Sequence, residues 1–171
     1  MNPKVVTVMT LVLGIVALSW VPGSRVRAST DSDKAEIVAL NQQQFDAFNK
    51  KDLDTVMSFY VDDKDAVFYE DSIPFQLNGV SALRKSDQEF FESADQIHGG
   101  FEDISVVVGG DLAAAHYTLT LSYKDKTGSH SESGRFTQVL KKVNGRWLIW
   151  HEHFSLPYDP TTGKAVLQAK P

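Results

Sequence analysis

The sequence predicts an α+β fold in which helices come first and an antiparallel sheet follows. Between Asp33 and Phe91, apolar residues mostly recur at steps of three or four, the spacing of amphipathic helices. From His98 onward, apolar and polar residues alternate, as in half-buried strands. Turn-forming residues divide this second part into four segments, so the strands are expected to form a meander rather than β-α-β units.

An apolar leader precedes this domain. The uncharged run Val5–Val21 is followed by Pro-Gly and by Val26-x-Ala28, a small-residue ending of the kind that signal peptidase cleaves. We expect residues 1–28 to be a signal peptide and the mature protein to be periplasmic or secreted. An uncleaved N-terminal anchor is the alternative, because the run of 17 residues is at the lower edge of what spans a bilayer. The chain has no cysteine, which excludes a disulfide and a lipid anchor on cysteine.

The remaining chain is expected to form one domain, residues 29–157, followed by a surface-attached or frayed tail, residues 158–171. Without the leader it contains 14 Lys and Arg against 22 Asp and Glu, a formal net charge of −8. Nucleic acids and anionic membranes bind clustered basic residues, so we expect neither as a partner.

Three helices are predicted. Asp33 with Glu36 resembles a capping box and would begin the first helix, which continues to Asn49. Asp52 is expected to cap a second, shorter helix that ends before the acidic turn 62–65. A third helix is expected after Gly79.

The predicted strands begin with a short one at Ala66 to Tyr69, followed by an irregular edge segment, 72–78, that contains Pro74. The four longer strands of the meander are expected at Phe101 to Val108, Ala113 to Tyr123, Ser133 to Val143 and Arg146 to Ser155.

Asn144-Gly145 is a strong signal for a two-residue hairpin turn, which would pair Val143 with Arg146. Continuing this register outward assigns the side chains of the last two strands to two faces. The first face would carry Phe136, Gln138, Leu140, Trp147, Ile149, His151 and His153, with Gln138 opposite His151 and Phe136 opposite His153. The second would carry Arg135, Thr137, Val139, Trp150, Glu152 and Phe154. Both faces contain large apolar residues, so we expect the helices to cover one, and a partner subunit or the tail to cover the other. We therefore predict a homodimer through the sheet.

Two stretches resemble the NTF2-like superfamily, especially SnoaL-like domains and the association domain of calmodulin-dependent kinase II. They are the closing hairpin, Arg135 to Pro157, and the segment Asn49 to Asp63. The resemblance implies a cone in which three N-terminal-half helices pack on a curved antiparallel sheet and leave a pocket at the open end. It also implies that the first face of the hairpin points inward. The kinase domains carry arginines at the positions matching Leu119 and Gln138, and both are absent here, which favours an uncharged, partly apolar ligand over an anion.

The residues expected to line this pocket share inward-facing positions implied by the resemblance. They are Tyr60, Phe68, Tyr117, Leu119, Gln138, Trp147, His151 and His153. For Tyr117 and Leu119, simple core packing is the alternative.

A proton-transfer site is a second possibility. In the ketosteroid isomerases of this superfamily, the catalytic carboxylate aligns with Glu70, and desolvation in an apolar pocket would raise its proton affinity. Glu70 or Asp71 would act as the base, with His151 as the acid or polarising donor. The tyrosine of those isomerases aligns with Gln44, a weaker donor to an enolate. A solvated turn is the alternative for the two carboxylates.

His151 and His153 point to the same side of one strand and could bind a metal only with a third ligand, for which His116, Glu70 and Asp71 are candidates. Hydrogen bonding and stacking within the fold is the alternative. The sequence has no P-loop, dinucleotide fingerprint or nucleophile elbow, and we expect no metal and no cofactor. Three functions stay open: binding of a small molecule, proton-transfer catalysis as an isomerase, dehydratase or cyclase, and a dimeric scaffold with a vestigial pocket.

Overall fold

The computed structural model describes residues 23–169, so most of the predicted signal peptide lies outside the described residues. The elements in chain order are α1 (Gly23–Asn49), α2 (Leu53–Met57), β1 (Val67–Tyr69), β2 (Leu77–Asn78), α3 (Val80–Ser93), β3 (Gln96–Gly109), β4 (Leu112–Asp125), β5 (Gly128–Val143), β6 (Arg146–Ser155), β7 (Tyr158–Asp159) and β8 (Lys164–Ala165). Helices precede the meander, so the predicted α+β class is confirmed.

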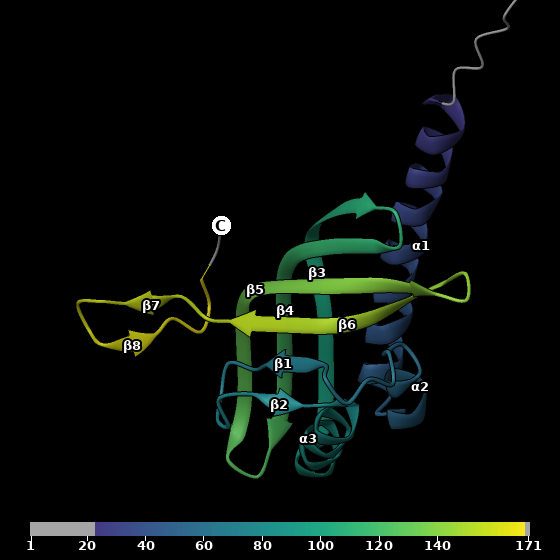
Figure 1. Ribbon diagram of the computed structural model, residues 1–171. Coiled ribbons are helices and arrows are strands. Elements are labelled where there is room, and N and C mark those ends of the chain that lie inside the picture. Colours follow the sequence, from purple (N-terminus) through teal and green to yellow (C-terminus); the bar gives the residue numbers. More distant parts are fainter. Residues whose placement is uncertain (1–22, 170–171) are drawn as a thin grey trace, which may run out of the picture.

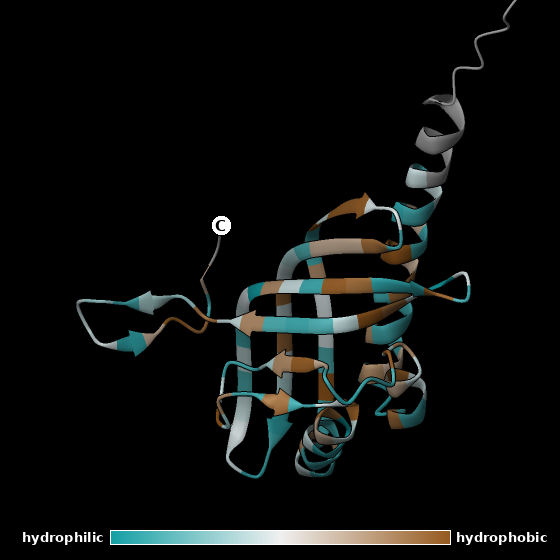
Figure 2. Cartoon of the chain, viewed as in Figure 1, coloured by the Kyte–Doolittle hydropathy of each residue, from teal (hydrophilic) through white to brown (hydrophobic). Residues whose placement is uncertain are grey.

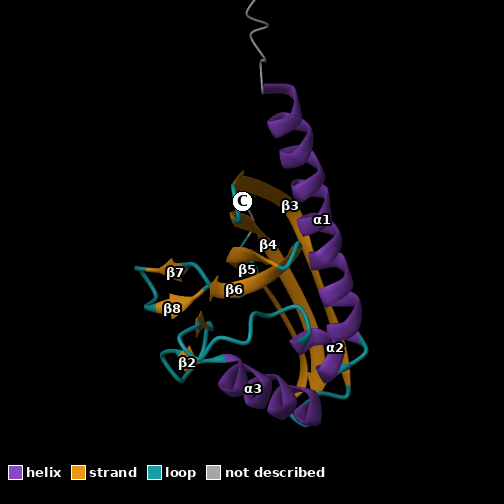
Figure 3. Ribbon diagram, turned by 45° about the vertical axis from the view of Figure 1, so that its right-hand side comes forward, coloured by secondary structure: helices purple, strands orange, loops and turns teal. Residues whose placement is uncertain are grey.

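A curved sheet forms the body of the molecule, with strand order β2-β1-β6-β5-β4-β3 (Figure 1). All neighbours are antiparallel except β1 and β6, which are parallel. Helix α1 lies along one side of the sheet, and α3 lies at the end where the β4–β5 turn is found (Figure 3). Three helices packed against a curved antiparallel sheet were expected, and this arrangement is confirmed except for the parallel pair of β1 and β6.

Helix α1 is longer than predicted. Its described part already includes Gly23, so the predicted start at Asp33 is wrong. A capping-box pattern is a short-range signal, and no glycine or proline interrupts residues 24–32. The Asp33 carboxylate instead accepts hydrogen bonds from Lys142 Nζ (2.5 Å) and Trp147 Nε1 (3.1 Å), and so fastens α1 to the last hairpin.

The end of α1 is also fixed to the sheet. Asn49 donates from Nδ2 to the Gly99 carbonyl (2.9 Å) and accepts from the Gly99 amide at Oδ1 (2.6 Å). A Cβ at Gly99 would lie 3.1 Å from the Phe45 ring, so the glycine allows the helix to approach β3 closely. Asp52 caps α2 as predicted, with its carboxylate accepting from the Thr55 amide (3.1 Å).

The register of the last hairpin changes part-way along it. Val143 pairs with Arg146 and Leu140 with Ile149, as expected, but a bulge then leaves Trp150 as an extra residue on β6. Beyond the bulge, Gln138 lies opposite Glu152 instead of His151, so that predicted pairing is wrong. The same shift places Phe136 opposite Phe154 instead of His153.

A shift of one residue exchanges the two faces of a strand. Glu152 and Phe154 are therefore buried in the interior, with 7% and 8% of their surfaces exposed, whereas His153 is exposed. Hydrophobic and hydrophilic residues both occur along the two strands of this hairpin, β5 and β6 (Figure 2). Trp150 was expected on the sheet face that a partner subunit would cover, but it contacts residues of its own chain. Its Nε1 donates a hydrogen bond to Asp63 (2.9 Å), and Lys141 Nζ lies 3.4 Å from its ring centroid.

The C-terminal segment forms the β7–β8 hairpin, which extends away from the sheet (Figure 1). After it, the Leu167 carbonyl accepts a hydrogen bond from the Ser133 amide (2.6 Å), which attaches the tail to β5. Within residues 23–169, no helix combines the length and the apolar character needed to cross a membrane.

Candidate functional site

A cavity of about 340 Å³ lies between the helices and the inner face of the sheet. Its walls come from α1, α3, the segment after α2, β1 and the segment after it, and strands β4, β5 and β6. The residues that line it are Gln44, Phe45, Phe48, Tyr60, Phe68, Tyr69, Glu70, Asp71, Ser72, Leu83, Ser86, Asp87, Phe90, Tyr117, Leu119, Leu121, Tyr123, Glu132, Phe136, Glu152 and Phe154. This volume falls within the range of small-molecule sites.

Aromatic rings make up much of the wall. Alternation along β4 directs Tyr117, Leu119 and Leu121 inward, on the face predicted from the sequence. The Tyr117 ring stacks on Phe136 with centroids 5.0 Å apart, and Phe90 of α3 meets Tyr123 edge-on at 5.1 Å. These ring contacts support one another and keep the wall in place around the cavity.

Five carboxyl groups share this aromatic cavity. They come from the segment after β1 (Glu70 and Asp71), from α3 (Asp87), from β5 (Glu132) and from β6 (Glu152). None of the described residues that line the cavity is lysine, arginine or histidine. The wall is therefore both aromatic and acidic.

Glu152 lies at the centre of a buried hydrogen-bond network. Its Oε2 accepts from Tyr60 Oη (2.8 Å), its Oε1 accepts from Gln138 Nε2 (2.8 Å), and Gln44 Nε2 donates to Tyr60 Oη (2.7 Å). Burial raises the pKa of Glu152, and the donors on Gln138, Tyr60 and Gln44 oppose this rise. Gln44, at the position that the resemblance matches to a catalytic tyrosine, supports a tyrosine from another element.

Glu70 and Asp87 have no such donors. Neither side chain has a hydrogen-bond or ion-pair partner within residues 23–169. Burial, followed by the nearby charges of Glu152, Asp71 and Glu132, raises the pKa of Glu70 to about 7. Burial and the charges of Glu70 and Glu152 raise the pKa of Asp87 well above its usual range. Both carboxyl groups therefore hold a proton to a higher pH than exposed carboxyl groups do.

Asp71 and Glu132 form a carboxyl pair across the cavity wall. Burial raises the pKa of Glu132 to about 7, and the charge of Asp71 and a hydrogen bond between the two carboxyl groups add to the rise. The pair joins the segment after β1 to strand β5.

The structure brings together six of the predicted site residues. Tyr60, Phe68, Glu70, Asp71, Tyr117 and Leu119 all line the cavity. Gln138 lies behind the wall, with its amide on Glu152, and Trp147 is packed in the core against Asp33.

The two histidines lie on the outer side of the sheet. Neither of them lines the cavity, and Tyr69 packs edge-on against both rings, at 5.3 Å from His151 and 5.5 Å from His153. His151 Nδ1 also lies 2.5 Å from the Val67 carbonyl. The prediction that they face inward is wrong, because the bulge at Trp150 reverses the faces of β6. Nor do they find a third ligand: among the described residues, no group of three metal-ligating side chains is close enough to hold an ion.

The sequence prediction missed three acidic wall residues. Asp87 carried a signal, because it occupies the apolar face of the third helix, four residues after Leu83. Glu132 lay one residue before the strand predicted to begin at Ser133. Glu152 was assigned to the wrong face by the unbroken register.

Comparison with known families agrees with this geometry. The model of the SnoaL-like domain matches residues 37–159. The chain belongs to the SnoaL-like domain family. No curated protein matches the chain significantly.

Solved structures show the same fold for this SnoaL-like domain. An NTF2-like protein of unknown function from Pseudomonas putida KT2440 is 25% identical, with a TM-score of 0.74 over 83% of this chain and 99% of that chain. A protein from Streptomyces avermitilis, described as a proposed dehydratase of the NTF2-like family, is 19% identical, with a TM-score of 0.66 over 73% and 97%. The association domain of calmodulin-dependent kinase II from C. elegans is 24% identical, with a TM-score of 0.59 over 74% and 98%.

Proposed function

We propose that this SnoaL-like domain binds a small organic molecule with a largely apolar body in the cavity. The observation that carries the proposal is the cavity itself, about 340 Å³ in volume and lined by ten aromatic side chains. An apolar molecule would gain free energy by leaving water for such a wall. Tyr117 and the wall carboxyl groups supply the few polar contacts that would set its orientation.

A thermal-shift screen tests this proposal. A ligand present at a hundred times its dissociation constant stabilises a protein by about 2.7 kcal/mol, which corresponds to a shift of roughly 5–10 °C in a domain of this size. The variant Leu119→Trp is expected to fill the cavity and abolish the shift, and Leu121→Trp serves if the first variant does not fold. Thr118→Trp is the matched control, since Thr118 lies on the opposite face of β4 and should leave binding unchanged. If no member of a hydrophobic panel shifts the unfolding temperature, the proposal is wrong.

Proton-transfer catalysis is the second candidate. It is favoured by the pKa of Glu70, which lies near neutral pH in an aromatic cavity, as a general base requires. The relative from Streptomyces avermitilis, proposed to be a dehydratase, points to the same class of chemistry. Since His151 lies outside the cavity, the acid paired with Glu70 would be Asp87 or Glu132.

The uncharged probe 5-nitrobenzisoxazole, which opens its ring when a base removes its carbon-bound proton, tests this candidate. The rate is expected to rise with pH around 7 as Glu70 ionises, and Glu70→Gln should lower it at least tenfold. Glu102→Gln changes an exposed residue of β3 and serves as the control. A rate that is the same in the wild type and in Glu70→Gln at every pH excludes Glu70 as the base.

Two further predictions concern where the protein is located and whether it forms a dimer. Export to the periplasm or medium remains a prediction from the leader sequence. Homodimerisation also remains a prediction, and one of the similar structures is named an association domain. Because Phe154 is buried and Trp150 is held by Asp63, a dimer would have to use other residues of the outer sheet face.

A further inference from the structure

We propose that the ligand of this cavity carries a positive charge: a small amine or quaternary ammonium ion with an apolar, ring-sized body. The inference rests on the proposed function and names its ligand class. It differs from the uncharged ligand expected from the sequence, because the three missed acidic residues all lie in the cavity wall.

The carboxyl groups converge from separate parts of the fold. Glu70 follows β1, Asp87 lies on α3, Glu132 on β5 and Glu152 on β6, yet all four line one cavity. Placing like charges together in a desolvated space destabilises their ionised forms. A cation entering the cavity would remove that repulsion and give Glu70 and Asp87 the partner that they lack within residues 23–169.

Aromatic rings lie beside these carboxyl groups. Phe90 is three residues after Asp87 on the same side of α3, and it contacts Tyr123. Leu121 pairs with Glu132, so Tyr123, two residues further along β4, lies close to the same carboxyl group. The negative faces of aromatic rings attract ammonium ions, most strongly in a cavity shielded from water. Rings and carboxylates in one wall thus favour a cation with an organic body.

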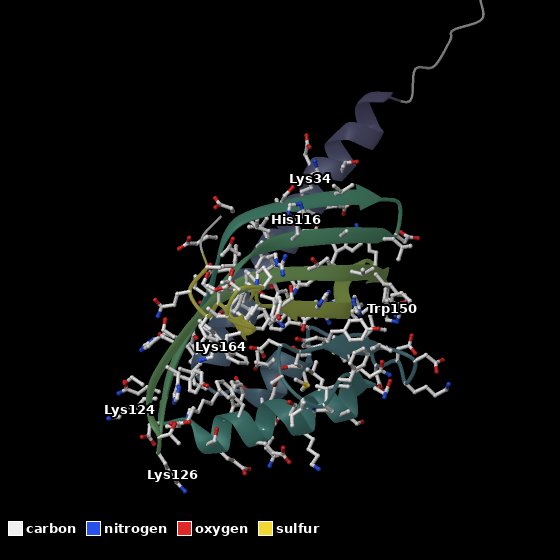
Figure 4. All side chains as sticks on the ribbon, turned by 90° about the vertical axis from the view of Figure 1, so that its left-hand side faces the viewer. Lys34, His116, Lys124, Lys126, Trp150 and Lys164 are labelled. Carbon is white, nitrogen blue, oxygen red and sulfur yellow. The ribbon has the colours of Figure 1, made fainter. Side chains whose placement is uncertain are left out.

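Other ligand classes fit this wall less well. An anion would meet five carboxyl groups and no basic side chain among the described lining residues. A bare metal ion would need three or more close ligands, and the described residues contain no such group. Lys124 and Lys126 are exposed at the β4–β5 turn and project from the tip of the hairpin, so they do not neutralise the wall (Figure 4).

Binding of a cation is expected to release protons. Glu70 and Glu132 have pKa values of about 7, so both are largely protonated below pH 6 and largely ionised above pH 8. The other titratable groups that face Glu70 are Tyr60, Tyr69, Asp71, Asp87, Tyr117, Tyr123 and Glu152, with His130 stacked behind Tyr123. The pKa values of Tyr60, Tyr117 and Tyr123 are raised above their usual value, so these phenols stay neutral in this range. The carboxyl groups would therefore set the pH dependence.

Two probes of the same shape test the inference: (4-hydroxyphenethyl)trimethylammonium and its uncharged carbon isostere, 4-(3,3-dimethylbutyl)phenol. Dissociation constants are measured by calorimetry on the full chain at pH 5.5 and pH 8. At pH 8 the cation is expected to bind at least tenfold more tightly than the isostere, and about tenfold more tightly than at pH 5.5. The isostere should bind equally at both pH values.

Variants locate the effect. Glu70→Gln and Asp87→Asn should each weaken binding of the cation at least fivefold and leave the isostere unchanged, whereas the surface control Glu102→Gln should change neither. If the isostere binds as tightly as the cation at pH 8, the inference is overturned and the proposed binding function stands. If neither probe binds, the inference is also overturned, and the uncharged panel with the Leu119→Trp variant decides the proposed function separately.

Discussion

Lowering the pH from 8 to 5 is expected to make this protein more stable. Folding raises the pKa of Glu70 from 4.5 to about 7, so the folded state binds more protons than the unfolded state between these values. The stabilisation that this linkage gives is fully present below about pH 4.5 and is lost as the pH rises through 7. One pKa unit corresponds to about 1.4 kcal/mol, so Glu70 alone contributes up to about 3 kcal/mol, or roughly 6–12 °C in unfolding temperature.

Thermal unfolding between pH 5 and pH 8, followed by circular dichroism, measures this effect. Glu70→Gln should be more stable than the wild type at pH 8 and should lose the part of the pH dependence that Glu70 supplies. Glu132 also stabilises the folded state at low pH, but by less, because it has more contact with solvent. The double variant Glu70→Gln with Glu132→Gln should therefore show an even weaker dependence of unfolding temperature on pH. Glu102→Gln should behave as the wild type does.

The pH range of this experiment matters. The pKa of Asp125 is lowered by hydrogen bonds from Thr127 and His130, so its contribution is lost at strongly acidic pH and would mask the rise. Above pH 5 this opposing effect is small. An unfolding temperature that falls steadily as the pH drops from 8 to 5 would contradict the raised pKa values and, with them, the desolvated state of the cavity carboxyl groups.

Carboxyl groups held together at a cost in stability are typical of functional sites. A packed, apolar wall at the positions of Glu70 and Asp87 would be more stable at neutral pH, yet the fold places unpaired acids there. The free energy that this arrangement of carboxyl groups costs would become available to a ligand that relieved their repulsion. Proton transfer and cation binding are two ways in which a molecule in the cavity would do so.

Much of the fold could be predicted because its signals are local. Asp52 caps α2 by contacts within one turn, and the Asn144-Gly145 turn fixes the pairing of Val143 with Arg146. Strict alternation on β4 similarly puts Tyr117 and Leu119 on one face, which the family resemblance implied to be the inner one. Such features depend on neighbouring residues, and a single sequence contains them.

The acidic character of the site depends on features that are not local. The bulge at Trp150 has no distinctive residue, such as glycine, to mark it, yet it decides whether His151 or Glu152 faces the cavity. The packing of Asp33 against Lys142 and Trp147 joins residues more than a hundred positions apart, so a capping box was the simpler interpretation. Because of this one extra residue in β6, the side chain that faces the cavity is the carboxyl group of Glu152 and not the imidazole of His151.

Replacing Glu152 by alanine is expected to destabilise the protein far more than replacing its neighbour His153. Glu152→Ala leaves Tyr60 Oη and Gln138 Nε2 buried without their acceptor, and it removes buried volume beside Phe68, with which Glu152 pairs. Each unsatisfied donor costs about 1–3 kcal/mol, part of which is offset by no longer burying a carboxyl group, so a net loss of about 2–4 kcal/mol is expected. Glu152→Gln keeps one acceptor oxygen in place and should cost less.

Urea unfolding at pH 7 compares the two Glu152 variants with His153→Ala. His153 is exposed, and its ring lies edge-on to that of Tyr69, so its replacement should cost less than about 1 kcal/mol. The comparison is informative because the two residues are adjacent on β6 and lie on opposite faces of it. The unbroken hairpin register predicts the reverse order, with His153 inside and Glu152 outside. A larger loss of stability for His153→Ala would therefore contradict the bulge at Trp150. It would also contradict the position of Glu152 as the central carboxyl group of the cavity.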